Sequence, residues 1–327
     1  MTASLTRDQA RGILSRAAGR KVAVLGDLML DRFVWGTVDR ISPEAPVPIV
    51  RVSRESLHLG GAGNVASNLV AMGGEAWPLG VVGSGPEADA LLEALALLRV
   101  DAGGVLQAPG RVTTVKTRIV AHNQQVVRFD QEQDDPLDDQ TAARLARRVL
   151  EVCATADALV VSDYEKGCVT ADLLSRVLPA AHARGIPIVV DPKPGLWRSY
   201  SPITAITPNQ SEASRMSGMR LRGDQEAASA GEAIRKALDC RAVLLTRGEL
   251  GMLLLEQGQR PLPIPATTRE VYDVTGAGDT VVAAMALCLA AGASLSEAAL
   301  LANAAAGVVV GKVGTATATP EEVSHSF

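Results

Sequence analysis

The sequence predicts an α/β protein with three layers, in which helices cover both faces of a mostly parallel central sheet. Short β-branched runs recur along the chain, mostly ending at a polar or glycine residue, at residues 21–26, 158–162, 187–190, 205–207 and 242–246. Alanine- and leucine-rich stretches with helical spacing accompany the later runs, at residues 138–152, 171–184 and 225–238. Strands that alternate with helices of this length form βαβ units. Runs that are apolar on both faces, such as Ile188-Val189-Val190, fit strands covered on each side.

Two regions break this alternation and predict a small β-stranded lid. Residues 31–52 carry Pro43, Pro46 and Pro48 and have no helical period. Residues 111–129 alternate between polar and apolar, with Asn123 between the two halves, which is typical of a β-hairpin outside the main sheet. This hairpin is either a flap over a site or an ordinary edge extension. We expect one domain over residues 1–327, with a discontinuous lid from about 32–56 and 104–130.

The composition excludes several classes of function. The chain of 327 residues has a formal net charge of −4 and no block of lysine or arginine, which argues against nucleic-acid binding. Its four cysteines are scattered and without CxxC spacing, as expected of buried thiols in a reducing compartment. No apolar stretch reaches the ~18 residues that span a bilayer, and the N-terminus does not resemble a signal peptide. We therefore expect a cytoplasmic protein that binds neither nucleic acid nor membrane.

Polar residues gather where the predicted strands end. They are Asp27, Asp163, Asp191, Lys193, Asn209, Glu212 and the run Thr246-Arg247-Gly248. Ligands of open parallel sheets collect at the carboxyl ends of the strands. Each of these residues alone would be an ordinary cap or turn residue, but their joint placement predicts a ligand site on one edge of the sheet.

The most informative motif is residues 273–279, Asp-Val-Thr-Gly-Ala-Gly-Asp, which leads into the apolar run 280–291. Gly276 and Gly278 at a helix start leave backbone N–H groups free, and with the helix dipole these form an anion site. Asp279 would repel a bound phosphate unless it is the base that deprotonates an attacking alcohol. A plain helix start with an acid for the dipole is the alternative.

A second glycine-rich motif is Gly60-Gly61-Ala62-Gly63-Asn64. Glycine lets the backbone approach a ligand, and the amide of Asn64 offers both a donor and an acceptor to sugar hydroxyls. The alternative is a tight turn in which Asn64 caps a helix.

Together these motifs resemble the ribokinase-like (PfkB) carbohydrate kinase family. The runs 60–64 and 273–279 are similar to its two signatures, and Asn209-Gln210-Ser211-Glu212 is similar to its metal-associated NxxE motif. The resemblance extends from about residue 21 to 317. It implies a ribokinase-like fold, an ATP-dependent transfer to a sugar, and use of Mg²⁺.

A narrower resemblance is to the D-glycero-β-D-manno-heptose-7-phosphate kinases, which make the 1,7-bisphosphate on the route to ADP-heptose for lipopolysaccharide. It rests on the segments 26–32, 39–48, 123–125, 161–164 and 191–193. The chain resembles the kinase alone, or the kinase half of a bifunctional heptose kinase/adenylyltransferase. Glu165 departs from this pattern, because a small residue is expected there, and the departure bears on the details of the substrate pocket.

The resemblance implies roles for residues in the C-terminal half. Asp279 would be the base, and the amides of Gly276, Ala277 and Gly278 would stabilise the transferring phosphoryl group. Asn209 and Glu212 would order Mg²⁺, partly through water, and Asp273 and Thr275 would contribute to a K⁺ site. The residues implied at the nucleotide are Asn209, Thr246, Gly248, Gly276, Gly278 and Asn303.

In the N-terminal half, Asp27, Asp31, Gly61 and Asn64 would hold the sugar. The cations expected near the substrate phosphate are Lys116, Arg118, Arg128 and Lys193. We favour Lys193 among them, because it follows a predicted strand end. Pairing of the lid between two copies would give a homodimer.

Three other functions stay open. One is another kinase of the same family, acting on a fructose or tagatose phosphate or on a nucleoside; the segment 42–48 disfavours it. The second is a non-catalytic sugar or nucleotide sensor, which would not need Asp279. The third is a dinucleotide-dependent oxidoreductase, for which Gly83-Ser84-Gly85 is the only support.

Overall fold

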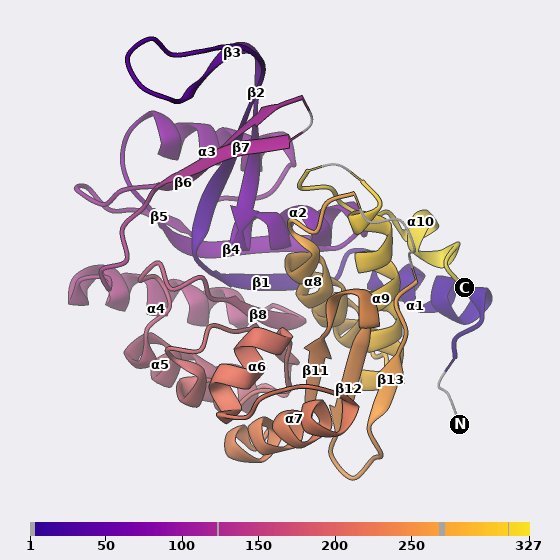
Figure 1. Cartoon of the computed structure of the whole chain (residues 1–327). Helices are drawn as coiled ribbons and strands as arrows, with labels where there is room; N and C mark the ends of the chain where they lie inside the picture. The colour runs from indigo at the N-terminus through magenta and orange to yellow at the C-terminus, as the bar shows by residue number, and fades with distance from the viewer. Residues whose placement is uncertain (1–3, 123, 268–271, 313) are drawn as a thin grey trace.

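The three-layer α/β/α architecture predicted from the sequence is confirmed by the computed structural model of the chain (Figure 1). The structure describes residues 4–122, 124–267, 272–312 and 314–327, so Asn123 of the predicted hairpin lies outside the described residues. Over the described part of the chain, a nine-stranded sheet lies between two helical layers, and a second sheet of four strands stands apart from it.

The main sheet has the strand order β13-β12-β11-β10-β9-β8-β1-β4-β5. From β11 to β5 every neighbouring pair is parallel, whereas β12 and β13 are antiparallel at one edge. Its strands are β1 (Lys21–Gly26), β4 (Glu75–Val82), β5 (Val105–Gln107), β8 (Ala158–Ser162), β9 (Ile188–Asp191), β10 (Ala205–Ile206), β11 (Ala242–Thr246), β12 (Met252–Glu256) and β13 (Leu262–Ile264). The five predicted runs are β1, β8, β9, β10 and β11, with bounds that differ by at most one residue.

Alternate side chains of each central strand enter two separate cores. In β1, Val22 and Val24 face one core and Ala23 and Leu25 face the other, as expected of a strand that is buried on both sides. The first core is covered by α1 (Arg7–Ala17), α2 (Ala62–Ala71), α3 (Pro86–Leu97), α8 (Ala277–Ala290), α9 (Leu295–Val310) and α10 (Pro320–Ser324). The second is covered by α4 (Asp139–Cys153), α5 (Ala171–Ala183), α6 (Gln210–Ser217) and α7 (Asp224–Leu238).

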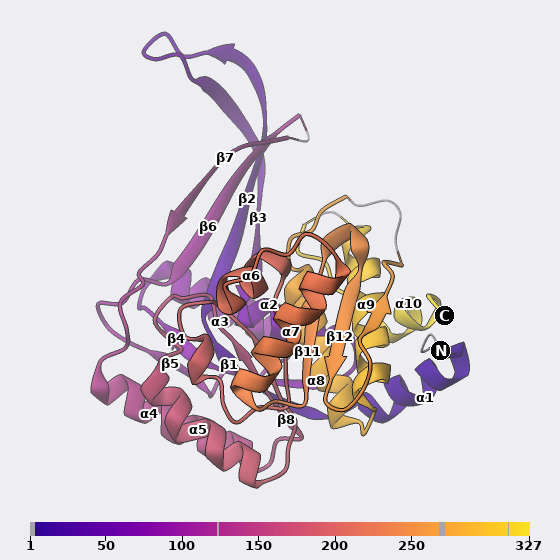
Figure 2. The same ribbon diagram turned by 60° about the horizontal axis from the view of Figure 1, so that its bottom comes forward.

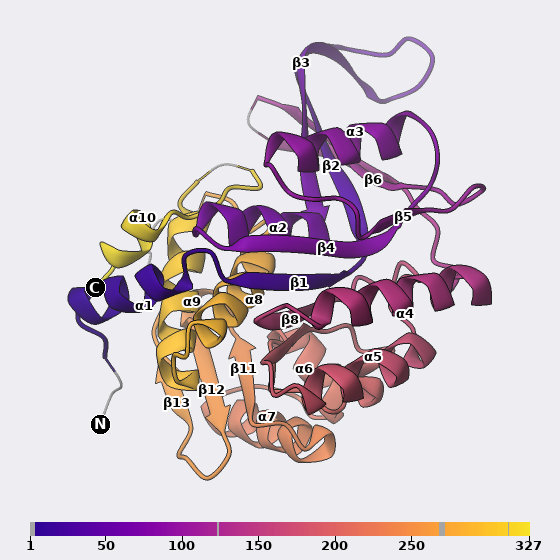
Figure 3. The same ribbon diagram turned by 180° about the vertical axis from the view of Figure 1, so that it is seen from behind.

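The helical layers are also visible from behind, where α4 and α5 lie side by side (Figure 3). The three predicted helices are α4, α5 and α7, each within one residue of its expected bounds. No helix in the described ranges is both long and apolar enough to cross a membrane.

The second sheet has the order β3-β2-β6-β7 and extends away from the body of the molecule (Figure 2). It contains β2 (Leu28–Ile41), β3 (Pro48–Gly61), β6 (Thr114–Ala121) and β7 (Gln124–Gln131). The predicted hairpin is β6–β7, which is antiparallel, while β6 runs parallel to β2. Residues 105–107 form β5 at the edge of the main sheet. Whether the second sheet acts as a lid stays a prediction.

Candidate active site

A cavity of about 230 Å³ lies where the base of the second sheet meets the start of α8. Its wall is formed by β2, the end of β3, β6, the loop after β8, and the turn that precedes α8. The lining residues are Met29, Asp31, Gly61, Lys116, Arg118, Tyr164, Thr275, Gly276, Asp279 and Thr315. The fold therefore brings predicted sugar-binding, phosphate-binding and catalytic residues into one space.

Asp279 is the most buried carboxylate in this wall, with 3% of its surface exposed. Its Oδ2 accepts a hydrogen bond from Nδ2 of Asn64 at 2.8 Å, and its Oδ1 accepts one from the hydroxyl of Tyr164 at 2.8 Å. Burial raises the pKa of Asp279 to about 6, although the two hydrogen bonds oppose the shift. A carboxylate with a pKa near neutrality is well suited to accept a proton from an alcohol.

The turn before α8 explains why the motif needs glycine at position 276. Gly276 is the N-cap of α8 with φ 80°, the left-handed region that glycine enters without a steric penalty. The N–H of Ala277 already donates to the carbonyl of Val274 at 3.2 Å. The amides of Gly276 and Gly278 are therefore the better candidates for contacts with a phosphate, and these roles stay predictions.

The other glycine motif closes the junction between the second sheet and α2. A Cβ on Gly60 would lie 2.6 Å from Oδ2 of Asp31, and one on Gly61 would lie 2.5 Å from the carbonyl oxygen of Asp27. Asn64 sits in the first turn of α2, whose N-cap is Gly61, so the interpretation of Asn64 as a helix cap is wrong. Its amide instead donates to Asp279, 215 positions away in the sequence.

Two of the predicted phosphate-binding cations lie in the cavity wall. Arg118 pairs with Asp31, so both residues already have a charged partner. Lys116 makes no ion pair with a carboxylate in the described part of the chain, and burial lowers the pKa of its ammonium group. Arg128, in contrast, pairs with Asp130 at 3.1 Å and does not line the cavity.

Asp27 lies outside the cavity wall, although it is only 2% exposed. Its carboxylate accepts hydrogen bonds from the backbone N–H groups of Tyr164, Lys166 and Cys168, at 2.7, 3.2 and 3.1 Å. Burial raises the pKa of Asp27 and these amides oppose the shift. The contacts fix the loop after β8; the role of Asp27 in sugar binding stays a prediction.

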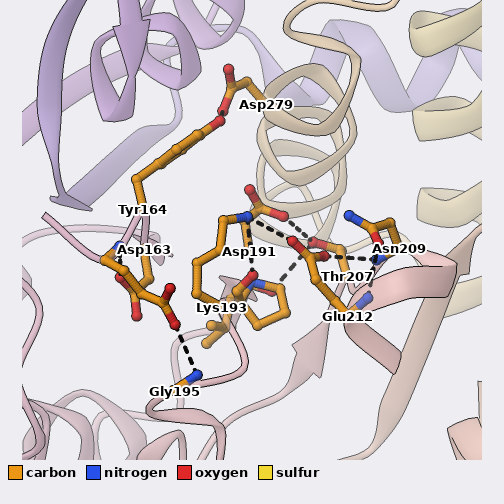
Figure 4. Close-up of polar contacts among 12 residues, drawn as sticks. Asp163, Tyr164, Asp191, Lys193, Gly195, Thr207, Asn209, Glu212 and Asp279 are labelled. Atoms are coloured by element: carbon orange, nitrogen blue, oxygen red, sulfur yellow. Dashed lines mark hydrogen bonds and ion pairs between the residues drawn. The ribbon is translucent and has the colours of Figure 1, made fainter. Parts of the chain in front are cut away.

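A charged cluster lies beside Asp279 at the ends of β9 and β10 (Figure 4). Nζ of Lys193 is 2.6 Å from Oε1 of Glu212, whose Oε2 accepts from the backbone N–H of Asn209. Burial raises the pKa of Asp191 to about 8, and the charges of Asp279 and Glu212 add to this shift. Burial acts to lower the pKa of Lys193, but the carboxylates of Asp191 and Glu212 outweigh it and raise the pKa.

The remaining predicted residues lie further from the cavity. Thr246 forms a β-bridge with Asn209, and Gly248 follows in a left-handed turn. The amide of Asn303 donates to the carbonyl of Pro265 at 2.9 Å. The carboxylate of Asp273 accepts from the N–H groups of Thr275 and Gly314, and so orders the turn before α8.

Sequence reasoning gave no role to three residues of the cavity wall: Met29, Tyr164 and Thr315. Tyr164 follows Asp163 at the carboxyl end of β8, and its place at a strand end could have identified it as a candidate site residue. The unexpected Glu165 has φ 55°, and its carboxylate accepts from the N–H of Gly195 at 2.9 Å. Its side chain is thereby directed away from the cavity.

Comparison with known proteins assigns the chain to a protein family. Residues 20–322 match the pfkB family carbohydrate kinases, so the chain belongs to this family and is a sugar kinase, a phosphotransferase.

Among curated proteins it is similar to the bifunctional protein HldE of Geobacter sulfurreducens, at 43% identity over 99% of the chain. It is also similar to the bifunctional protein HldE of Caulobacter vibrioides, at 46% identity over 97% of the chain. The chain spans 66% and 65% of the length of these two relatives.

Solved structures support the fold. Ribokinase of Arabidopsis thaliana, complexed with ribose and ATP, matches with a TM-score of 0.75 and 21% identity, covering 94% of this chain and 98% of that one. Phosphofructokinase-2 of Escherichia coli, in complex with potassium, matches with a TM-score of 0.78 and 23% identity, covering 94% and 97%. At these identities the likeness shows a shared ribokinase-like fold.

Proposed function

We propose that this chain is an ATP-dependent sugar-phosphate kinase whose substrate is D-glycero-β-D-manno-heptose 7-phosphate. The single observation that carries the proposal is the cavity. Asp279, in the first turn of α8, forms one part of its wall, and Lys116 with the Asp31–Arg118 pair forms another. The heptose assignment is supported by the sequence motifs and by the similarity to proteins named HldE. The product would be the 1,7-bisphosphate, a precursor of ADP-heptose in lipopolysaccharide synthesis.

In the proposed reaction Asp279 accepts the proton of the anomeric hydroxyl. The sugar oxygen then forms a bond to the γ-phosphorus of ATP, while the bond from that phosphorus to the bridging oxygen breaks and ADP leaves. The N–H groups of Gly276 and Gly278 at the start of α8 would stabilise the negative charge on the transferring group. Because Asp279 is buried and accepts two hydrogen bonds, its carboxylate is held in place before substrate arrives.

Lys116 is the residue we propose for the substrate's own phosphate. It lines the cavity, and its ammonium group has no carboxylate partner within the described ranges. Arg118 and Lys193 line or border the same space but are already paired with Asp31 and Glu212. A phosphate at Lys116 would gain a partner without breaking an existing ion pair, and its negative charge would oppose the lowering of the Lys116 pKa by burial.

Mg²⁺ would be held beside the nucleotide by Glu212 and Asp191, with Asn209 acting through water. Burial is the main cause of the raised pKa of Asp191, and the negative charges of Asp279 and Glu212 add to it; a cation would relieve this excess of negative charge. In the described part of the chain no three His, Cys, Asp or Glu residues form a metal cluster. This fits Mg²⁺, which takes one or two carboxylates and completes its shell with water and phosphate oxygens. Mg²⁺ would neutralise charge on the phosphates, and Asp273 and Thr275 would order a K⁺ site.

The second sheet is the part we propose to act as a lid within a single kinase domain. It carries exposed apolar side chains at Ile41, Val52, Val126, Val127 and Phe129. These side chains come from β2, β3 and β7 and are available to a second copy, so they support a homodimer that pairs through this sheet.

The test is ADP release from ATP with heptose 7-phosphate, fructose 6-phosphate, ribose and adenosine, for the wild type and Asp279→Asn. We expect turnover with heptose 7-phosphate alone and a loss of about 10²–10⁴-fold in the variant. Asp172→Asn, in the first turn of α5, is the matched control and should keep full activity. Turnover of another sugar would overturn the substrate. Silence across the panel with ATP still bound would favour a sensor.

A further inference from the structure

Tyr164 lines the cavity, but the proposed reaction gives it no role. It is the second residue after β8 and is partly buried, and its hydroxyl donates to Oδ1 of Asp279 at 2.8 Å. Figure 4 shows the phenol reaching from the loop after β8 to the carboxylate at the start of α8. The two residues are 115 positions apart in the sequence, so only the fold brings them together.

The phenol is held in place by contacts other than the one to Asp279. The backbone N–H of Tyr164 donates to Asp27 at 2.7 Å, which anchors the loop at the position of the tyrosine itself. Nζ of Lys116 on β6 and Nζ of Lys193 after β9 each lie 5.1 Å from the centroid of its ring. Cation–π contacts of this kind attract an ammonium to the face of an aromatic ring. Tyr164 therefore contacts Lys116 of the second sheet and Lys193 after β9 through its ring, and Asp279 through its hydroxyl.

We propose that Tyr164 is a positioning residue for the catalytic base: its hydroxyl orients the carboxylate of Asp279 and favours its ionised form. The inference rests on the proposed function, in which Asp279 is that base. An ionised carboxylate accepts about four hydrogen bonds. The bonds from Tyr164 and Asn64 therefore leave lone pairs on Asp279 for the substrate hydroxyl, and Tyr164 does not have to move.

The phenol remains a donor throughout the working pH range. Burial raises the pKa of Tyr164 well above its usual value, and the nearby charges of Asp279 and Asp191 add to this shift. A tyrosine that stays protonated always offers its O–H to the carboxylate, and a donor to the charged form lowers the pKa of an acid. The hydroxyl of Tyr164 thus opposes the effect of burial on Asp279, as the amide of Asn64 does.

Other charges also act on Asp279 and must stay constant in a test. The groups that face it or line its cavity are Asp31 on β2, Lys116 and Arg118 on β6, Asp191 at the end of β9, and Lys193 in the loop after β9. Tyr164→Phe removes one oxygen and keeps the aromatic ring on which Lys116 and Lys193 lie. Of the contacts described above, the substitution therefore removes only the hydrogen bond to Asp279.

The experiment is a titration of the substrate-free enzyme, carrying ¹³C-labelled aspartate carboxyl groups, followed by NMR. Asp279→Asn identifies the Asp279 signal by its loss. We expect Tyr164→Phe to raise the pKa of Asp279 by about one unit, the size expected from losing a hydrogen bond to a charged acceptor. Tyr200→Phe is the matched control, because that buried phenol donates to Asp163 and makes no contact with Asp279. It should leave the Asp279 signal unchanged.

The pH dependence of kcat/KM, which reports the pKa of the base in the free enzyme, gives a second readout. In Tyr164→Phe we expect kcat/KM to fall about fivefold near pH 6, and very little near pH 8, where the base is ionised in both enzymes. An unchanged pKa of Asp279, or a loss of kcat/KM that is equal at every pH, would overturn the inference. The titration needs no substrate, so it stays informative if no sugar of the panel is turned over. In that case the proposed function fails while the hydrogen bond to Asp279 is still measured.

Discussion

The turn at Gly276 packs against Asn64, the residue whose amide donates to Asp279, and this contact gives a sharp prediction for Gly276→Ala. A Cβ at this position would lie 2.5 Å from Nδ2 of Asn64, which is the atom that donates to Asp279. Ordinary contact begins near 3.4 Å, so the amide of Asn64 must retreat by roughly 1 Å to relieve the overlap. A shift of that size breaks its 2.8 Å hydrogen bond to the carboxylate.

The change in the free energy of unfolding caused by Gly276→Ala has two unfavourable contributions and one favourable contribution. Placing a side chain at φ 80° costs about 1–2 kcal/mol, and losing a hydrogen bond to a charged acceptor costs about 1.5–3 kcal/mol. The stiffer unfolded chain returns about 0.4–1 kcal/mol. We therefore expect Gly276→Ala to lower the free energy of unfolding by about 2–4 kcal/mol.

Urea unfolding of three proteins tests this prediction: the wild type, Gly276→Ala and Gly278→Ala. Gly278 lies two residues further into α8, and a Cβ there would meet no atom within 4 Å. Gly278→Ala should therefore be neutral or stabilising by up to about 1 kcal/mol, because alanine favours the helix and restricts the unfolded chain. Equal losses in both variants, or a loss below about 0.5 kcal/mol for Gly276→Ala, would refute the steric argument.

Two further predictions concern the reaction. Burial raises the pKa of Asp279 to about 6, and a base works only when ionised, so kcat/KM, which reports the free enzyme, should be level above this pH and fall about tenfold per unit below it. A profile of kcat/KM that stays flat down to pH 5 would contradict the assignment. Lys116→Ala should raise the KM for the sugar phosphate about tenfold or more, since it removes a charge-assisted contact, and change the KM for ATP less than twofold. The exposed Lys236 on α7 provides the control substitution, and equal effects on both KM values would exclude Lys116 as the phosphate anchor.

The sequence by itself determined the local features of the fold. Strands β1, β8 and β11 and helices α4, α5 and α7 were predicted within one residue, because hydrophobic period and glycine placement are local properties of the chain. The β6–β7 hairpin followed from its alternation in the same way. The two glycine motifs also carried the resemblance to the PfkB family, and the family match over residues 20–322 confirms it.

Only the tertiary structure decided which side chains are partners. Asp27 and Asp31 were both predicted to hold the sugar, with Asp27 preferred. The carboxylate of Asp27 accepts hydrogen bonds from amides of the loop after β8, whereas Asp31 lines the cavity and pairs with Arg118. Lys193 was the favoured phosphate ligand; in the fold its ammonium group pairs with Glu212, and its role at the phosphate stays a prediction. Which residues become partners depends on where distant segments meet. A one-residue change of strand register would turn every side chain of that strand to the opposite face of the sheet and so change its partners.

The hydrogen bond from Tyr164 to Asp279 has the same origin. Nothing near position 164 in the sequence indicates that Asp279 accepts the hydrogen bond, because the acceptor comes from a helix that starts more than a hundred residues later. The sequence therefore determined that a carboxylate, that of Asp279, stands at the start of α8. Its pKa and orientation were decided by the packing of α2, the loop after β8 and α8 around it, since burial and hydrogen bonding act through space rather than along the chain.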